Sequence, residues 1–172
     1  MSNRFPMFAA IGVVAVAIVL FFVFRETKGN HLELKGEILK VRTGAIDDNN
    51  CAAVLDFRLT NPSDVPFVVR MVKVIAVEPG GEQLDGDLIS KTDFKQLLDY
   101  NRFLGEQYNP GFSIKDKIAP HETADRMVAV RFEVPQSKLE NASQIKMWVQ
   151  DVDGPEFETA KSMHEVSKPA RP

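Results

Sequence analysis

An uninterrupted apolar segment near the amino terminus is the feature that most constrains this chain. Residues 7–24, from Met7 to Phe24, are eighteen apolar residues with no charge and a single glycine, Gly12. At 1.5 Å of rise per residue, a helix of this length spans about 27 Å, close to the ~30 Å hydrocarbon core of a bilayer. We therefore expect a transmembrane helix over residues 7–24, preceded by a short tail (1–6) and followed by a tether (25–31).

Two alternatives for this segment are a cleaved signal peptide and a buried core helix. The apolar part of a signal peptide usually has about 7–15 residues and ends at a small-x-small site. Here the run is longer, and its last four residues are FFVF, where a peptidase needs small side chains. The triplet Ala15-Val16-Ala17 lies inside the run. The sequence favours a retained anchor.

The charges beside the anchor are too evenly matched to fix its orientation, since Arg4 precedes it and Arg25, Glu26 and Lys28 follow. The very short tail ahead of it favours translocation of the following domain. We expect a single-pass protein of the cell membrane, with its soluble domain on the extracytoplasmic (periplasmic) side.

The charge of the remaining chain limits its partners. Residues 30–172 hold 18 basic and 23 acidic residues, a net charge of −5. Such a surface argues against nucleic acid and against docking on anionic lipid headgroups, because both favour basic patches. The single cysteine, Cys51, excludes an internal disulfide and is expected to be a small buried apolar residue.

Apolar and polar residues alternate with a period of two through most of the soluble part, which predicts strands with one buried face. Such runs cover residues 53–60, 128–134 and 145–149, whereas residues 67–77 are almost continuously apolar, as in a central strand covered on both faces. Turns rich in Pro, Gly and Asn separate the runs. The aromatic residues expected in the core are Phe57, Phe67, Phe132 and Trp148. The sequence predicts a mainly β, antiparallel Ig/fibronectin-III-like β-sandwich over residues 32–154.

Both ends of the predicted domain are less regular. A first strand begins at Leu32 and Leu34, and its apolar phase slips before Leu39, which suggests a bulge at Gly36. Residues 155–172 are polar and are expected to form a disordered tail.

One insertion has helical instead of strand spacing. Apolar residues recur at three- and four-residue intervals from Asp93, Asp93 and Gln96 can form a capping box, and Gly105 can end a helix. We expect one short inserted helix, of about ten residues within 93–104, followed by an aromatic loop that ends at residue 112.

A resemblance to a known family supports the predicted fold. The stretch AAVLDFRLTNPSDVPFVVRMVKVIAVEPGGEQLDGD resembles the water-stress and hypersensitive-response (WHy) domain of the group 2 late-embryogenesis-abundant proteins. The shared features are a strand ending in Asn61-Pro62, a second proline at Pro66, a Val-rich strand and the Gly80-Gly81 turn. Residues 118–135 resemble small bacterial Ig-like membrane-anchored domains, although Pro120-His121-Glu122 replaces their usual Pro-Gly-Glu. Over residues 50–134 the resemblance implies an Ig-like sandwich, often membrane-anchored, without catalytic residues.

The sequence has no pattern typical of an enzyme, a cofactor site or a metal site. Motifs such as G-x-S-x-G and S-x-x-K are missing. The three histidines lie in the tether, a turn and the tail, without metal-ligand spacing. Two acidic turns, residues 47–50 and 151–154, lack the spacing of a calcium loop and are better explained as Asx turns. We expect no catalytic, cofactor-binding or metal-binding residues.

Recognition of another protein remains, and the insertion is the best place for it. Its aromatic residues, together with one arginine, are of the types enriched at interface hot spots. An alternative is that they belong to a helix that caps an open end of the sandwich and covers the core there. The candidate interface residues are Phe94, Tyr100, Arg102, Phe103, Tyr108 and Phe112.

The sequence therefore suggests three functions. The first is a non-enzymatic, membrane-anchored interaction domain, most concretely an accessory subunit of a larger membrane complex, which contacts lipid through residues 7–24 and binds other membrane proteins. The second is a free-standing envelope or desiccation-stress protective protein, suggested by the resemblance. The third is a small-ligand-binding sandwich, which requires an apolar pocket between two sheets. The oligomeric state does not follow from the sequence.

Overall fold

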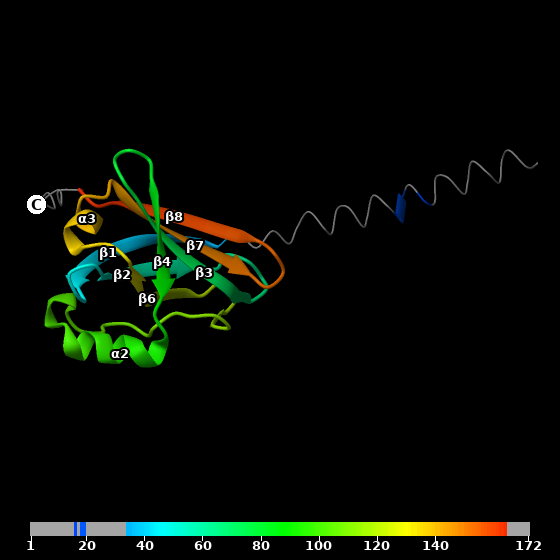
Figure 1. Ribbon diagram of the computed structural model, residues 1–172. Helices are drawn as coiled ribbons and strands as arrows, with labels where there is room; N and C mark the ends of the chain where they lie inside the picture. The colour runs from blue at the N-terminus through cyan, green and yellow to red at the C-terminus, as the bar shows by residue number, and fades with distance from the viewer. Residues whose placement is uncertain (1–15, 17, 20–33, 165–172) are drawn as a thin grey trace, which may run out of the picture. The chain divides into compact units, whose positions relative to one another are not determined.

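The computed structural model describes residues 16, 18, 19 and 34–164, and residues 34–164 form a β-sandwich with short helices (Figure 1). The predicted span with Met7, Gly12 and Phe24 lies outside the described residues, apart from three positions. None of the helices within the described residues combines the length and the apolar character that crossing a bilayer requires. The elements in chain order are β1 (Lys35–Ala45), β2 (Cys51–Thr60), β3 (Phe67–Val77), β4 (Gln83–Leu88), α2 (Lys91–Tyr100), η1 (Arg102–Leu104), β5 (Lys117–Ile118), β6 (Thr123–Phe132), α3 (Gln136–Glu140), β7 (Gln144–Asp151) and β8 (Glu156–Ser162).

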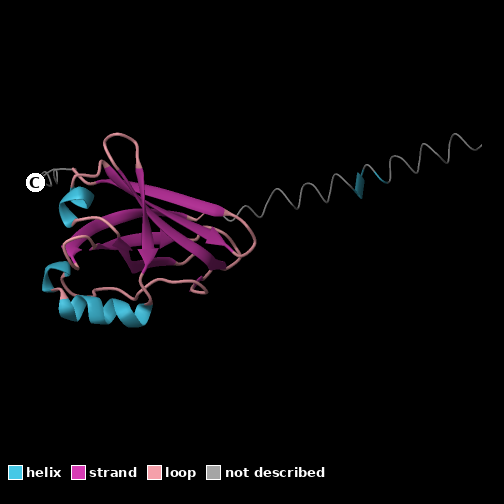
Figure 2. Ribbon diagram, viewed as in Figure 1, coloured by secondary structure: helices cyan, strands magenta, loops and turns pink. Residues whose placement is uncertain are grey.

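All the pairings between these strands are antiparallel, and their order is β1-β2-β6-β4-β3-β7-β8. The short strand β4 joins the two layers, because residues 83–86 pair with β3 while Asp87 and Leu88 pair with β6. One layer therefore contains β1, β2 and β6, and the other contains β3, β7 and β8 (Figure 2). The predicted antiparallel sandwich is confirmed.

The core lies between these layers and is formed by the residues that the alternation selects. Ala53, Leu55, Phe57 and Leu59 of β2 face it, as do Ile145, Met147 and Val149 of β7. Phe57, Phe67 and Phe132 are completely buried. Trp148 was predicted to be in the core, and this is wrong: it is half-buried, and its indole Nε1 donates to Glu156 Oε2 at 3.2 Å. Because its neighbours Met147 and Val149 point inward, Trp148 must point outward.

The prediction of a disordered tail from residue 155 is wrong for residues 156–162, which form β8 and pair with β7 along its whole length. Every second residue of β8 is charged or small and exposed, and of the residues facing inward only Phe157 is a large apolar one. An edge strand with so little apolar surface looks like a polar tail in the sequence. Residues 165–172 lie outside the described part of the chain.

Two strands depart from their predicted details. The register of β1 shifts between Ile38 and Lys40, so the bulge lies at Leu39 and not at Gly36. Gly36 instead allows close approach of β2, because a Cβ there would lie 2.2 Å from the carbonyl oxygen of Arg58. Strand β3 is central in its layer, but only its inner face is fully buried, and Met71 on the outer face is 45% exposed.

The Asn-Pro segment and the Pro-His-Glu turn have structural roles. Asn61 is fully buried, and its amide donates to the carbonyls of Val65, Ile118 and Ala119 at 2.8–3.2 Å. It thereby joins the end of β2 to the end of β5. His121 in this turn adopts a positive φ of 58°, a region that glycine enters without strain.

Candidate interaction surface

The insertion lies on the outer face of the β1-β2-β6 layer, and its helix begins earlier than predicted. Ser90 caps α2: its hydroxyl accepts from the backbone N–H of Asp93 at 3.2 Å and donates to the Asp93 carboxylate at 2.8 Å. The capping pair is therefore Ser90 with Asp93, not Asp93 with Gln96. The helix ends at Tyr100, and a separate 3₁₀ turn follows, which ends at Gly105 with a φ of 75°.

The inner side of the insertion builds a second hydrophobic core. Phe94, Leu98 and Leu104 are buried against the outer faces of β2 and β6. The residues that they cover are Ala52, Val54, Met127 and Ala129. Strand β2 is consequently buried on both faces over its first half. The insertion thus covers a face of the sandwich and does not cap an open end.

The loop after the 3₁₀ turn is fastened to the sheet by a buried arginine. The Arg42 guanidinium on β1 donates to both carboxylate oxygens of Asp56 on β2, at 3.2 and 3.0 Å. It also donates to the carbonyls of Leu104 and Glu106 in the insertion. The side chains of Arg42 and Asp56 are only 9% and 10% exposed. Because one planar group on β1 bonds to both β2 and the loop, it fixes the loop on the sheet.

A second fixed point is Asn101, the residue between α2 and the 3₁₀ turn. Its amide donates to the carbonyl of Ala45 at 2.8 Å, and its side-chain oxygen accepts from the N–H of Phe103 at 3.1 Å. The chains approach closely at Gly44, where a Cβ would lie 2.8 Å from Asn101 Nδ2 and 3.1 Å from the Leu104 side chain. Asn101 and Gly44 together hold the 3₁₀ turn against the end of β1.

The structure divides the six predicted interface residues into two groups. Phe94 and Phe112 are each 2% exposed, and the Phe112 ring contacts that of Phe57 edge-on with centroids 5.3 Å apart. These two residues belong to the core, so their assignment to an interface is wrong. Phe103 is 92% exposed and Tyr100 is 78% exposed, and Arg102 between them is also exposed. Tyr108 is 66% exposed, with Arg42 5.4 Å from its ring centroid.

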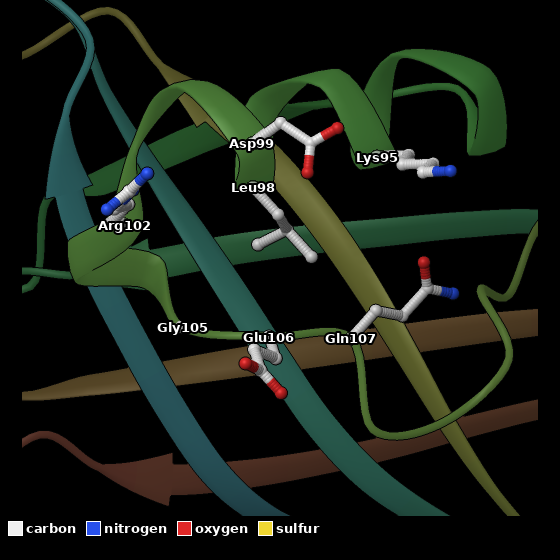
Figure 3. A pocket seen from close by; sticks show the side chains of 7 residues that line it. All are labelled: Lys95, Leu98, Asp99, Arg102, Gly105, Glu106 and Gln107. Atoms are coloured by element: carbon white, nitrogen blue, oxygen red, sulfur yellow. The ribbon is translucent and has the colours of Figure 1, made fainter.

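We call Tyr100, Arg102 and Phe103 the aromatic surface. These three residues border a depression whose other lining residues are Thr43, Gly44, Ala45, Asn101 and Gln136. A second depression lies between α2 and the returning loop, where Lys95, Asp99 and Arg102 face Glu106 and Gln107 (Figure 3). Leu98 points into the space between the helix and the loop. Both depressions adjoin Arg102, so a partner seated on the aromatic surface would reach apolar rings and charges of both signs.

In both acidic turns, an aspartate carboxylate accepts hydrogen bonds from backbone N–H groups. The Asp47 carboxylate accepts from the N–H groups of Asn49 and Asn50, both at 2.8 Å, and the bond from Asn49 is the main reason that the pKa of Asp47 is lowered. Asp151 is buried and accepts from the N–H of Val68 at 2.6 Å and of Asp153 at 2.8 Å. Among the described residues, no group of three or more potential ligands is arranged to hold a metal ion.

Cys51 is fully buried at the start of β2, where burial raises its pKa to about 11. At neutral pH it therefore remains a neutral thiol, as expected for a core residue. His121 lies in an exposed turn, with its Nε2 2.9 Å from the Asp64 carboxylate.

Three residues that organise the aromatic surface were not identified from the sequence: Arg42, Asp56 and Asn101. Asp56 is one of two charged residues in β2, the other being Arg58, and both lie on the outward face, which the alternating pattern predicts to be exposed to solvent. A buried charge on a predicted polar face cannot be recognised until the element that covers it is known. For Asn101, the one sequence signal was its position between the predicted helix and Gly105, where asparagine often caps a helical turn.

The comparisons with known proteins give no family. No family model matches the chain, and the search of curated proteins gives no match. Among solved structures, an uncharacterized β-sandwich protein from Clostridium difficile 630 is 13% identical, with a TM-score of 0.34, over 77% of this chain and 82% of its own. A chain of a flagellar-like filament is 8% identical, with a TM-score of 0.34, over 96% of this chain and 100% of its own. At these TM-scores the likenesses carry no argument about the function of this chain.

Proposed function

We propose that this protein is a non-enzymatic, single-pass membrane-anchored interaction domain, most concretely an accessory or structural subunit of a larger membrane protein complex. The apolar run from residue 7 to 24 supports the anchor by its length and lack of charge. The domain is placed on the extracytoplasmic side of the cell membrane, and its sandwich is of the Ig/fibronectin-III type that the resemblance implies.

The observation that carries this proposal is the exposure of Phe103 on a firmly held turn. Phe103 is 92% exposed although Asn101 and Leu104, its close neighbours in the chain, are buried. Moving a phenylalanine side chain from water into an interface contributes about 1.5–3 kcal/mol. Because Asn101 and Arg42 already fix the backbone here, little conformational entropy is lost when a partner binds.

Affinity purification of the full-length protein from membranes in mild detergent tests this proposal. We expect a stoichiometric set of membrane proteins with the wild type and much less with Tyr100→Ala or Phe103→Ala. A matched control is Met71→Ala, which removes an apolar side chain 45% exposed on the other layer and should leave recovery unchanged. Equal recovery with all three variants would refute the assignment of the surface, and recovery of the protein alone would refute the accessory-subunit role.

Tyr108 is expected to behave differently from Tyr100. Its ring lies against Arg42 at 5.4 Å, a cation–π contact that contributes about 0.5–1 kcal/mol at exposed sites. Tyr108→Ala should therefore lower the melting temperature slightly, whereas Tyr100→Ala should leave it nearly unchanged.

The stress-protective role is the alternative, and it rests on the resemblance over residues 50–134. It predicts that the protein purifies alone and that the aromatic surface is dispensable. The ligand-binding role has less support, because the two depressions described above lie on the insertion, while the space between the layers is filled by buried side chains such as Phe57, Phe67 and Phe132.

A further inference from the structure

The negative charge of the domain is concentrated at the end of the sandwich where β1, β3 and β6 end and where α3 lies (Figure 1). Residues 34–164 hold 16 basic and 21 acidic residues. The three segments that connect strands at this end, residues 46–50, 78–82 and 133–143, contain six acids and one cation, Lys138. We call this the acidic end, and its acids are Asp47, Asp48, Glu78, Glu82, Glu133 and Glu140.

The cations beside the acidic end do not cancel its charge. Lys138 pairs with Glu78 at 2.9 Å. Arg131, near the end of β6, pairs with Asp87 at 3.0 Å and with Glu133 at 3.2 Å. The strand ends thus add the acid Asp87 and the cations Arg131 and Lys161, so seven acids lie together with three cations.

The acidic end adjoins the aromatic surface through Glu140. Its Oε1 accepts from the Thr43 hydroxyl at 2.9 Å and from the Gln136 amide at 2.7 Å, and both donors line the depression bordered by Tyr100, Arg102 and Phe103. Asp48 follows Ala45, another lining residue, by three positions. Glu140 and Asp48 are exposed, and neither forms an ion pair within residues 34–164. Both carboxylates are therefore available to a cation that a partner brings to the depression.

Arg102 does not make this surface basic. It lines the second depression together with Lys95, and Asp99 and Glu106 line the same depression (Figure 3). The insertion therefore offers a partner equal numbers of both signs here, and the excess charge beside the aromatic surface is that of the acidic end.

We propose that the partner of the aromatic surface binds through a basic segment. An apolar side chain of this segment packs against Tyr100 and Phe103, and its lysine or arginine side chains pair with Asp48 and Glu140. The inference rests on the proposed function, because it names the chemistry of the partner at that same surface. Complementary charges around an apolar contact speed association and exclude wrong partners.

Two other occupants fit the acidic end less well. A second copy of the chain joined through the same surface would bring two acidic ends together, and like charges at an interface are costly. A metal ion needs converging ligands, and among the described residues no group of three or more potential ligands is arranged to hold one. Carboxylates spread over separate segments suit a chain with spaced cations.

The test uses the full-length protein and the affinity purification in mild detergent described above. The double variant Asp48→Asn, Glu140→Gln removes two charges from the acidic end and keeps the size of both side chains. Its matched control, Glu37→Gln, Asp153→Asn, removes two exposed charges near the start of β1 and in the turn between β7 and β8. All four side chains are exposed, so both double variants should melt as the wild type does.

The acidic-end double variant should lower recovery of the partner about tenfold at low salt, since each exposed ion pair contributes up to about fivefold. The control should keep wild-type recovery. Because salt screens exposed charges, the difference between the two double variants should become smaller from about 50 mM to about 500 mM salt.

A zero-length carbodiimide crosslink then locates the partner's lysines, because it joins a carboxylate to an amine only when the two are in contact. Lys138 and Glu78, 2.9 Å apart, provide an internal positive control. We expect a partner lysine joined to Asp48 or Glu140. Equal recovery with both double variants, or crosslinks from these two carboxylates to a second copy or to Lys168 of the same chain instead of the partner, overturns the basic segment alone. Recovery of no partner by the wild type refutes the proposed function and this inference with it.

Discussion

Replacing Arg42 with methionine is expected to destabilise the protein by about 3 kcal/mol. The substitution keeps most of the aliphatic volume. It leaves the Asp56 carboxylate, which is 10% exposed in the wild-type protein, without its guanidinium partner. Removing one member of a buried ion pair costs about 3–5 kcal/mol. We expect the lower end of this range, because the hydrogen bond to Glu106 is exposed and water can reach the site when the loop moves.

The loss should begin in the insertion. Arg42 bonds the carbonyls of Leu104 and Glu106 to the sheet, so Arg42→Met should speed amide exchange in residues 101–108 more than in β3 or β7. Urea unfolding of the full-length protein in mild detergent, followed by the fluorescence of Trp148, gives the global change. Hydrogen exchange with mass spectrometry gives the local one.

Two further variants separate the cost of leaving the Asp56 carboxylate unpaired from the loss of the hydrogen bonds that hold the insertion on the sheet. The double variant Arg42→Met, Asp56→Leu removes the unpaired carboxylate and should recover at least 1 kcal/mol relative to Arg42→Met, although exchange in residues 101–108 should stay fast. Arg58→Met removes an arginine that is 48% exposed and should cost less than about 1 kcal/mol, as is usual for an exposed ion pair. A loss below about 1 kcal/mol for Arg42→Met, with exchange in residues 101–108 as in the wild type, would refute this reasoning.

Three other predictions follow from local geometry. Gly44→Ala places a Cβ 2.8 Å from Asn101 Nδ2 and should cost about 1–3 kcal/mol in urea unfolding, whereas Gly80→Ala, with nothing within 4 Å of its Cβ, should be neutral; equal effects would contradict the close approach. Burial raises the pKa of Cys51 to about 11, so a disulfide reagent at pH 8 should modify it only in denaturant, and rapid native modification would contradict this. The hydrogen bond from Arg58 lowers the pKa of Asp125 in the folded protein. The ionised carboxylate therefore stabilises the fold above the unfolded pKa near 4, and this stabilisation is lost as the pH falls through the folded pKa. The difference in melting temperature between wild type and Asp125→Asn should shrink from pH 7 to pH 3, and a constant difference would contradict this linkage.

The parts of the fold that the sequence predicts well are those with a strong periodic signal. In β2 and β7, alternating residues face the core as predicted, and Asn61-Pro62 ends β2. The strand β8 was missed because an edge strand needs few apolar residues. The start of α2 was misplaced because both Ser90-Asp93 and Asp93-Gln96 fit a capping box, and only the backbone geometry distinguishes them.

The candidate site was predicted only in outline. The spacing of apolar residues places Phe94 in a helix, but it does not show which apolar residues of the insertion contact the sheet and which face solvent. The split between buried Phe94 and exposed Phe103 follows the change from α2 to a 3₁₀ turn at Asn101, in which Leu104 packs against the sheet and Phe103 faces solvent. Arg42 bonds to Leu104 and Glu106, which lie 62 and 64 positions after it in the sequence. No local sequence pattern can predict contacts between residues so far apart.

Photocrosslinking in intact membranes from position 103 tests most directly whether the aromatic surface binds a protein partner. A photoreactive phenylalanine analogue would replace Phe103 in the full-length protein, and Met71 in a control. We expect one discrete crosslinked membrane protein from position 103 and none from position 71. The absence of a protein crosslink at position 103, or the same products from both positions, would contradict the claim that the aromatic surface binds a protein partner.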